Sequence, residues 1–198
     1  MPLLDSELQK GQDLFNLNVF SVVAVTNAFV PLLKTSKGTL INIGSVAGKS
    51  AMPWQAYYNA SKAAILTITD SYRQELAPFD ITVISIIAGG VKTNFWANHD
   101  GGKLPAGSLY APASEEVERV LNGAGIDAES ADVNVFAMSV VTNALRSKPK
   151  AHHWVGSSAW TVWILSTFAW ETVWDLVGKV YFEMGAVNKK IRTAQKSG

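Results

Sequence analysis

The chain has 198 residues, of which 48% are hydrophobic and 17% charged, and these proportions suit one globular domain rather than a disordered chain. A net charge of +1 offers no electrostatic basis for binding nucleic acid. The sequence contains no cysteine, which excludes disulfides, thiolate metal sites and cysteine nucleophiles. The opening run MPLLDSELQKG lacks a basic region followed by an apolar core, so we do not expect a secreted protein.

The first part of the chain reads as a helix followed by a strand, a helix and a strand. Apolar residues at helical spacing predict a helix over 5–34, which Pro31 should bend or end. The runs TLINI (39–43) and ITVISII (81–87) predict two buried strands, and a helix over about 55–76 connects them. This order predicts an α/β fold in which the strands are parallel and covered on both faces, with a right-handed crossover.

The later part of the chain is expected to be mostly helical. Residues 88–112 are rich in Gly, Asn and Pro and predict a long loop of the kind that often covers a substrate. Two helices are expected near 113–121 and 129–146. We therefore divide the chain into an α/β part with the site (1–112), a helical substrate-side segment (113–150) and a C-terminal extension (151–198).

The C-terminal extension is rich in tryptophan, since five of the seven tryptophans lie between Trp154 and Trp174. The apolar run 159–170 is too short to span a bilayer. A polar stripe is expected on one face of a helix, at Thr167, Glu171, Asp175 and Lys179. Two interpretations stay open: residues 154–183 contact a membrane surface, or they pack on the domain or on a second subunit.

The stretch YYNASKAA, residues 57–64, carries a candidate acid/base pair. Residues four apart share a helix face, which pairs Tyr58 with Lys62 and pairs Tyr57 only with Ser61. A phenol has a pKa near 10, and an adjacent ammonium is expected to lower it. Tyr58 tuned in this way could give a proton to a carbonyl oxygen or take one from an alcohol.

Three further motifs support this pair. Ser45 lies thirteen residues before Tyr58, in GSVAG directly after the first predicted strand, where α/β sheets place reactive groups. Asn18 lies within the first predicted helix, in FNLNVFSV. The loop AGGVKTN (88–94) follows the second strand, at the neighbouring carboxyl end.

These elements, in this order and at this spacing, resemble the short-chain dehydrogenase/reductase (SDR) family over roughly residues 3–95. The motifs that match are NIGSVAG, YNASKAA and GGVKTN. The resemblance implies a partial Rossmann-like fold that lacks the first four strands, with a helical, Trp-rich C-terminal extension. Within the family, the run PLLKTSKGTLINIGSVAG looks most like the fungal NADPH-dependent 1-acyldihydroxyacetone phosphate reductase group.

The resemblance also implies a role for each site residue. Tyr58 would be the general acid/base, and Lys62 would lower its pKa and hold the nicotinamide ribose. Ser45 would orient the carbonyl, and Asn18 would support a water relay to Lys62. The remaining implied contacts are to the nicotinamide carboxamide and a nearby phosphate, from Val91 and Thr93.

The same resemblance sets expectations for cofactor, substrate and partners. It implies NADP(H) as the cofactor and a lipid-like or secondary-metabolite carbonyl or alcohol as the substrate. It implies a homodimer, or pairing with a full-length relative, through the first two helices. It is compatible with a cytoplasmic location or with peripheral attachment at the endoplasmic reticulum or lipid droplets.

The family's glycine-rich turn has no counterpart in the sequence, which we interpret as an N-terminal truncation that leaves the first predicted strand with an open edge. The run LNGAGIDAES (121–130) imitates a strand-end motif but follows an acidic helix, so we expect a loop. No metal site is expected, and we expect His99, His152 and His153 to lie at the surface.

Three functions remain open at this point. The first is an SDR reductase that uses NADP(H). The second is a cofactor-independent isomerase or dehydratase that uses Ser45, Tyr58 and Lys62 for proton transfer. The third is a non-catalytic module that pairs with a full-length relative.

Overall fold

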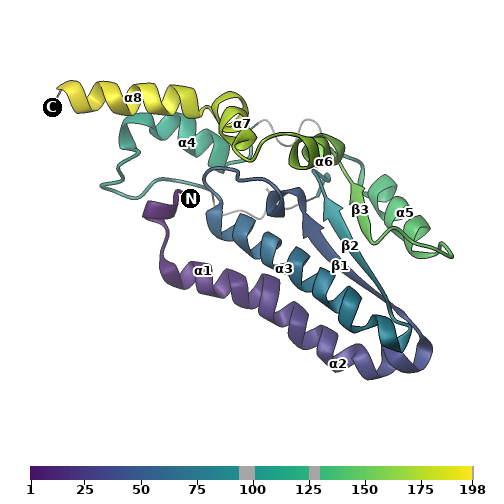
Figure 1. The fold of residues 1–198 in the computed structure, drawn as a ribbon. Coiled ribbons are helices and arrows are strands. Elements are labelled where there is room, and N and C mark those ends of the chain that lie inside the picture. The colour runs from purple at the N-terminus through teal and green to yellow at the C-terminus, as the bar shows by residue number, and fades with distance from the viewer. Residues whose placement is uncertain (94–100, 125–129, 198) are drawn as a thin grey trace.

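The fold is built around a three-stranded parallel sheet, and it was obtained as a computed structural model (Figure 1). The strand order is β1-β2-β3, and the strands are β1 (Thr39–Ser45), β2 (Thr82–Ala88) and β3 (His152–Val155). The structure describes residues 1–93, 101–124 and 130–197. The predicted α/β class and the two predicted parallel strands are confirmed.

The third strand was missed by the sequence analysis. Its four residues, HHWV, are short and partly polar, and they lack the alternating or apolar pattern that marks a strand. They become a strand because β2 offers a free edge, and the pairing runs from Ser85 and His152 to Ala88 and Val155. β3 comes from the C-terminal extension, which therefore contributes directly to the sheet.

The first helical region differs from the single helix expected over 5–34. It begins with a short 3-10 turn, η1 (Leu3–Asp5), and the helix proper starts only at Leu8. It then runs through α1 (Leu8–Phe15), a π-helical turn η2 (Asn16–Phe20) and α2 (Ser21–Ser36). Pro31 does not end α2, which continues to Ser36 and stops where Lys37 adopts the left-handed conformation.

Helix α3 (Ala56–Glu75) connects β1 to β2 and packs against both strands and against the first helical region (Figure 1). Tyr72 of α3 donates a hydrogen bond of 2.8 Å to the side chain of Asn27 on α2. The ring of Tyr57 lies so close to Gly11 of α1 that a Cβ there would meet it at 2.8 Å. Tyr57 is therefore a packing residue, which agrees with the choice of Tyr58 for chemistry.

The two central strands differ in how well they are covered. β2 is buried along its whole middle, with Ile84, Ile86 and Ile87 fully enclosed. β1 lies at the edge of the sheet, and Ile43 on its outer face is 50% exposed. The expectation that both strands are covered on both faces holds for β2 and is wrong for β1, because no described element packs on the outer face of its carboxyl half.

The continuous helical stretch Leu8–Ser36 is long and apolar enough to cross a membrane, judged by length and composition alone. One side of it is occupied by contacts to α3, through Gly11, Asn18 and Asn27. Its other side carries exposed apolar residues, among them Phe20 and Phe29. In this fold the stretch is a helix layer of the α/β domain.

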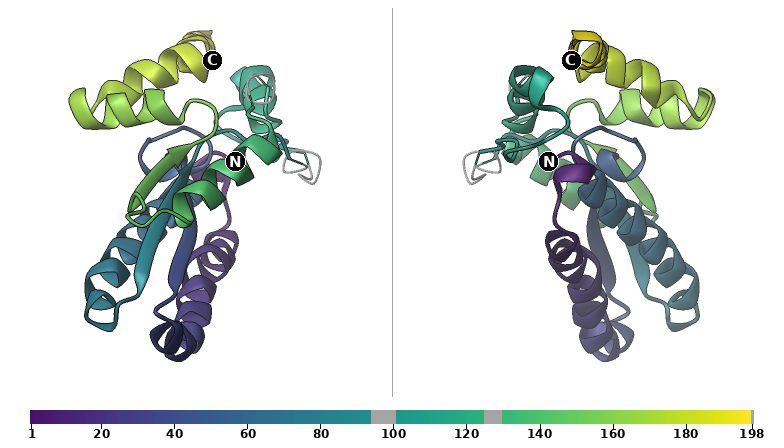
Figure 2. Two further views of the ribbon diagram at one scale, coloured as in Figure 1. Left: turned by 90° about the vertical axis from the view of Figure 1, so that its right-hand side faces the viewer. Right: turned by 90° about the vertical axis from the view of Figure 1, so that its left-hand side faces the viewer.

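The remaining chain is helical, as expected. The two helices predicted after the loop are α4 (Ser114–Leu121) and α5 (Val133–Ala144). The C-terminal helices are α6 (Ala159–Phe168), α7 (Val173–Tyr181) and α8 (Met184–Ser197). Figure 2 shows α6 and α7 extending away from the rest of the domain in both views.

The polar stripe expected on one C-terminal helix is wrong, because the helix is broken. The chain is extended at Ala169, so Thr167 ends up in α6 while Asp175 and Lys179 lie in α7. The physical reason is packing: Val162 of α6 and Trp174 of α7 both contact the core cluster above β2, and one straight helix could not place both there.

Candidate active site

The carboxyl ends of β1 and β2 meet at one end of the sheet, and two of the predicted motifs lie there. Ser45 is the last residue of β1 and is in register with Ala88, the last residue of β2. The loop that starts at Gly89 therefore leaves the sheet beside Ser45. Reactive groups of open α/β sheets gather at this end, as the sequence analysis expected.

Tyr58 and Lys62 occupy the first two turns of α3 and share a face, as predicted. The Lys62 Nζ atom lies 5.8 Å from the centre of the Tyr58 ring. The same ammonium donates a hydrogen bond of 3.4 Å to the backbone carbonyl of Ile43. Lys62 thus reaches from α3 to the end of β1, two residues before Ser45.

Burial decides the electrostatics of this pair. Burial raises the pKa of Tyr58, and the Ser45 hydroxyl opposes part of this rise. Burial also lowers the pKa of Lys62. The sequence predicts that the ammonium lowers the pKa of Tyr58, and the direction is opposite because the cost of removing the phenolate from water exceeds the opposing effect of the hydrogen bond with Ser45. The phenol is therefore protonated at neutral pH and is suited to donate a proton.

The loop GSVAG is pressed against the site helix. A Cβ on Gly48 would lie 2.6 Å from the carbonyl carbon of Lys62, so only glycine fits at this place. Ser45, at the start of the loop, accepts a hydrogen bond of 3.1 Å from the amide of Ala47. The sequence analysis did not assign a role to Gly48, although a glycine that closes the motif was a usable signal.

Asn18 lies in the π-helical turn η2, a feature that is frequent at functional sites. Its side-chain amide donates a hydrogen bond of 3.1 Å to the hydroxyl of Ser61. Ser61 is fully buried and in turn donates to the carbonyl of Tyr58 at 2.8 Å. Asn18 therefore anchors α3 between Tyr58 and Lys62, and its role in a water relay stays a prediction. Ser61 was missed as a member of this site.

The loop after β2 is held by backbone hydrogen bonds to Ala131, just before α5. The Gly90 carbonyl and the Lys92 amide bond to Ala131, at 3.1 and 2.9 Å, and together form a parallel bridge opposite Val91. Because alternate groups of an extended chain face opposite sides, the amide and carbonyl of Val91 point away from this bridge. Thr93 lies at the end of the described part of this loop, and Asn94 lies outside it.

Trp54 closes the approach to α3 and was not considered by the sequence analysis. It has a left-handed backbone with φ of 68°, a conformation that costs free energy for a bulky residue. Its ring packs edge-on against Tyr110, with ring centres 5.1 Å apart, and Trp54 shares a buried cluster with Val117 of α4 and Val187 of α8. The segment that leads into the site helix is therefore held by a cluster built from α4 and α8.

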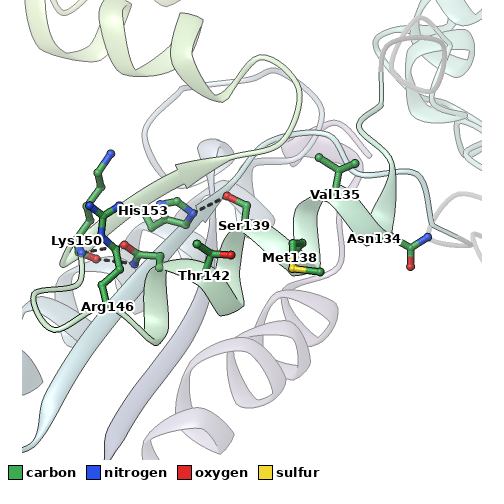
Figure 3. Close-up of a pocket in the computed structure, with 9 residues that line it drawn as sticks. Asn134, Val135, Met138, Ser139, Thr142, Arg146, Lys150 and His153 are labelled. Carbon is green, nitrogen blue, oxygen red and sulfur yellow. Dashed lines mark hydrogen bonds between the residues drawn. The ribbon is translucent and has the colours of Figure 1, made fainter.

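A cavity lined by α5 and β3 lies away from Tyr58. It has a volume of about 590 Å³ and lies between α5 and β3 (Figure 3). His153 lines it and is only half-buried, with Ser139 at 3.0 Å, while the exposed His152 is 2.6 Å from Asp70. The expectation of surface histidines thus holds for His152 and only partly for His153, whereas His99 lies outside the described residues.

Comparison with known proteins agrees with this geometry. The short chain dehydrogenase family model matches residues 1–103. Short-chain dehydrogenase fogD of Aspergillus ruber is 33% identical over 96% of this chain and 65% of its own length. Short-chain dehydrogenase srdE of Neurospora crassa is 34% identical over 99% of this chain and 67% of its own length. The chain thus spans about two thirds of the length of these curated relatives.

Solved structures have the same fold. A short-chain dehydrogenase from Streptomyces avermitilis superposes with a TM-score of 0.70 at 23% identity, over 91% of this chain and 65% of the other. A short chain dehydrogenase from Burkholderia cenocepacia, solved in complex with NADP, gives a TM-score of 0.57 at 24% identity, over 85% and 62%. The family match, the fungal relatives and the Ser45–Tyr58–Lys62 geometry agree: this chain belongs to the short-chain dehydrogenase family of oxidoreductases.

Proposed function

We propose that the chain is the catalytic part of an NADP(H)-dependent reductase that reduces the carbonyl of a lipid-like or secondary-metabolite substrate. The observation that carries this proposal is the placement of the Tyr58 phenol beside Ser45 at the carboxyl end of β1, where burial raises the pKa of Tyr58 and favours its protonated form. A protonated phenol is the form needed to reduce a carbonyl, whereas alcohol oxidation needs the phenolate.

The proton movement follows from these residues. The Ser45 hydroxyl donates a hydrogen bond to the substrate oxygen and fixes its position. Tyr58 gives its proton to that oxygen as the carbonyl carbon accepts a hydride, and the resulting phenolate regains a proton from solvent. The positive charge of Lys62 stabilises the phenolate in between. The hydride itself is the chemistry that a bound NADPH supplies.

Several groups of this chain fit the nicotinamide end of NADP(H). The Lys62 ammonium has three donors, of which the Ile43 carbonyl accepts one, so two suit a ribose diol. The outward amide and carbonyl of Val91 form a donor–acceptor pair that matches a carboxamide. Thr93 follows as the proposed phosphate contact. Support for NADP over NAD comes from the Burkholderia cenocepacia structure in complex with NADP.

The surroundings of Ser45 favour an apolar substrate body. Val46, the next residue, belongs to a buried cluster against which three large side chains pack half-buried: Met52, Trp154 and Trp174. Flexible and aromatic side chains of this kind suit an acyl chain or a ring system better than a charged metabolite. The proposed substrate class rests on this cluster.

A dimer through the first two helical regions also belongs to this proposal. Exposed apolar residues recur along η2 and α2, and the set includes Leu17, Phe20, Val25, Phe29 and Leu32. A row of exposed apolar side chains along one helix usually marks a contact surface. Size-exclusion chromatography tests it: Phe20→Asp with Phe29→Asp should convert a dimer to a monomer, and an unchanged elution volume would contradict the dimer.

The function itself is tested with purified protein, NADPH and a panel of apolar ketones. Tyr58→Phe should lower the rate of NADPH oxidation by about 10²–10⁴-fold, with NADPH binding by fluorescence unchanged. Tyr57→Phe is the matched control and should keep the rate, because Tyr57 packs against Gly11. Activity that depends on Tyr58 but not on NADPH would indicate proton transfer without cofactor. Absence of NADPH binding would exclude the reductase for this chain.

A further inference from the structure

The three C-terminal helices form one surface, which we call the C-terminal surface and define as α6, α7 and α8. They lie in a row along the upper end of the molecule, the end toward which the strands point (Figure 1). Large apolar side chains are exposed on α6, on α7 and in the turn between them: Trp160, Ile164, Phe168, Trp170, Leu176, Val180 and Tyr181. Phe168 is 74% exposed and Tyr181 is 77% exposed.

These side chains are not displaced core residues. The inner faces of α6 and α7 already bury Val162 and Val173, and Trp174 packs on the cluster beside Val46. On the outer side, Trp163 contacts Trp160 at 5.3 Å and Phe168 at 5.7 Å, both edge-on. The aromatic groups therefore form an organised cluster that faces away from the domain.

Helix α8, which follows this cluster, is positively charged, whereas the α6–α7 segment itself carries Glu171, Asp175 and Lys179. Helix α8 carries four bases and no acid between Met184 and Ser197. Lys190 is paired with Glu116 of α4 at 2.6 Å, which leaves the exposed side chains of Lys189, Arg192 and Lys196 on the outer side. An aromatic patch beside a basic helix is complementary to an anionic bilayer, in which Trp and Tyr occupy the interface and bases meet the headgroups.

We propose that the C-terminal surface binds the face of an anionic lipid bilayer, with α6 and α7 lying in the interface and α8 against the headgroups. Helix α6 has ten residues, too few to span a bilayer, so the contact is peripheral. The carboxyl ends of the strands, with Ser45, lie at this same end of the molecule. Where the proposed reductase function also holds, an apolar substrate would reach the site from the membrane.

Sedimentation with vesicles tests the proposal on the full chain. Vesicles of phosphatidylcholine with phosphatidylserine should carry the protein down, and vesicles of phosphatidylcholine alone should carry less. The variant Trp160→Ala, Phe168→Ala, Trp170→Ala should weaken binding by more than about tenfold, since each aromatic side chain contributes through buried apolar area. Lys189→Glu with Arg192→Glu should also weaken binding to the anionic vesicles by more than about tenfold, since each base near an anionic surface adds to the attraction.

The matched control is Val135→Ala, Met138→Ala, Leu145→Ala, which removes three exposed apolar side chains outside both the C-terminal surface and the proposed dimer face. This control should keep vesicle binding, and equal loss in both variants would overturn the proposal. Failure of the wild type to sediment with anionic vesicles would also overturn it. A change of oligomeric state in the triple variant with Trp160→Ala would overturn it as well, because it would assign the surface to contact with a second copy of the chain. Circular dichroism confirms that each variant folds. NADPH oxidation is measured separately, so failure of the reductase function leaves the vesicle result intact.

Discussion

The side chain of Asn42, on β1, donates a hydrogen bond of 3.0 Å to the hydroxyl of Thr69, on α3. Both residues are buried, with Thr69 only 2% exposed. Thr69 also donates to the carbonyl of Ile65 within its own helix. This small polar network fixes the height of α3 along β1, and with it the position of Tyr58 and Lys62 relative to Ser45.

Replacing Thr69 with Val should destabilise the fold by about 1–3 kcal/mol, because it leaves the buried amide of Asn42 without its acceptor while the volume stays the same. Urea denaturation followed by circular dichroism measures this change. Thr67→Val is the matched control on the same helix, since its hydroxyl is exposed and donates to the carbonyl of Ala63. Equal effects of the two substitutions would show that the network does not matter for stability.

Gly48→Ala should also destabilise the fold, by about 1–3 kcal/mol, because its Cβ would collide with the backbone of Lys62. It should lower catalytic rate as well, since relief of the clash moves the loop or the helix at the site. Gly185→Ala, in α8, is the control, because a Cβ there would have its nearest neighbour, the carbonyl oxygen of Lys179, at 3.8 Å. Helix propensity predicts that this control raises the free energy of unfolding by about 0.5–1 kcal/mol. A thermal melt of both variants compares them directly.

The titration of Tyr58 provides a test that does not require activity. Its folded pKa lies above the ordinary value of 10.0 because of burial. Stability linked to this group is fully present below about pH 10 and is lost as the pH rises through the folded pKa. The difference in ultraviolet absorbance between the wild type and Tyr58→Phe, followed to high pH, should show a midpoint above 10.0. A midpoint below that value would restore the sequence-based expectation that Lys62 lowers this pKa.

Val187 links the C-terminal helix to the approach of the site. It is 1% exposed and contacts the cluster that holds Trp54. Val187→Ala should lower the free energy of unfolding by about 1–3 kcal/mol, because it leaves a cavity in the core. It should also shift tryptophan emission to longer wavelength, because the indole of Trp54 gains access to water. The control Val180→Ala removes an exposed side chain of α7 and should change neither quantity. An unaltered stability in Val187→Ala would show that α8 does not clamp this segment.

Much of the site was predictable because its signals are local. A helix repeats its face every four residues, so the spacing alone selects Tyr58 and Lys62 and assigns Tyr57 elsewhere. The apolar run before Ser45 predicts the strand that ends there. Composition along 159–181 likewise predicts helices rich in aromatic residues. These conclusions need only the neighbouring residues in the chain.

The remainder depends on contacts between distant segments. β3 forms because β2 presents a free edge, and the C-terminal helix breaks at Ala169 because two of its side chains share one core. The pKa of Tyr58 rises because burial outweighs the hydrogen bond with Ser45, a balance that residue spacing cannot predict. By itself the sequence determined which residues share a helix face or end a strand. Only the tertiary structure decided which groups are buried, since burial is set by elements that pack from elsewhere in the chain.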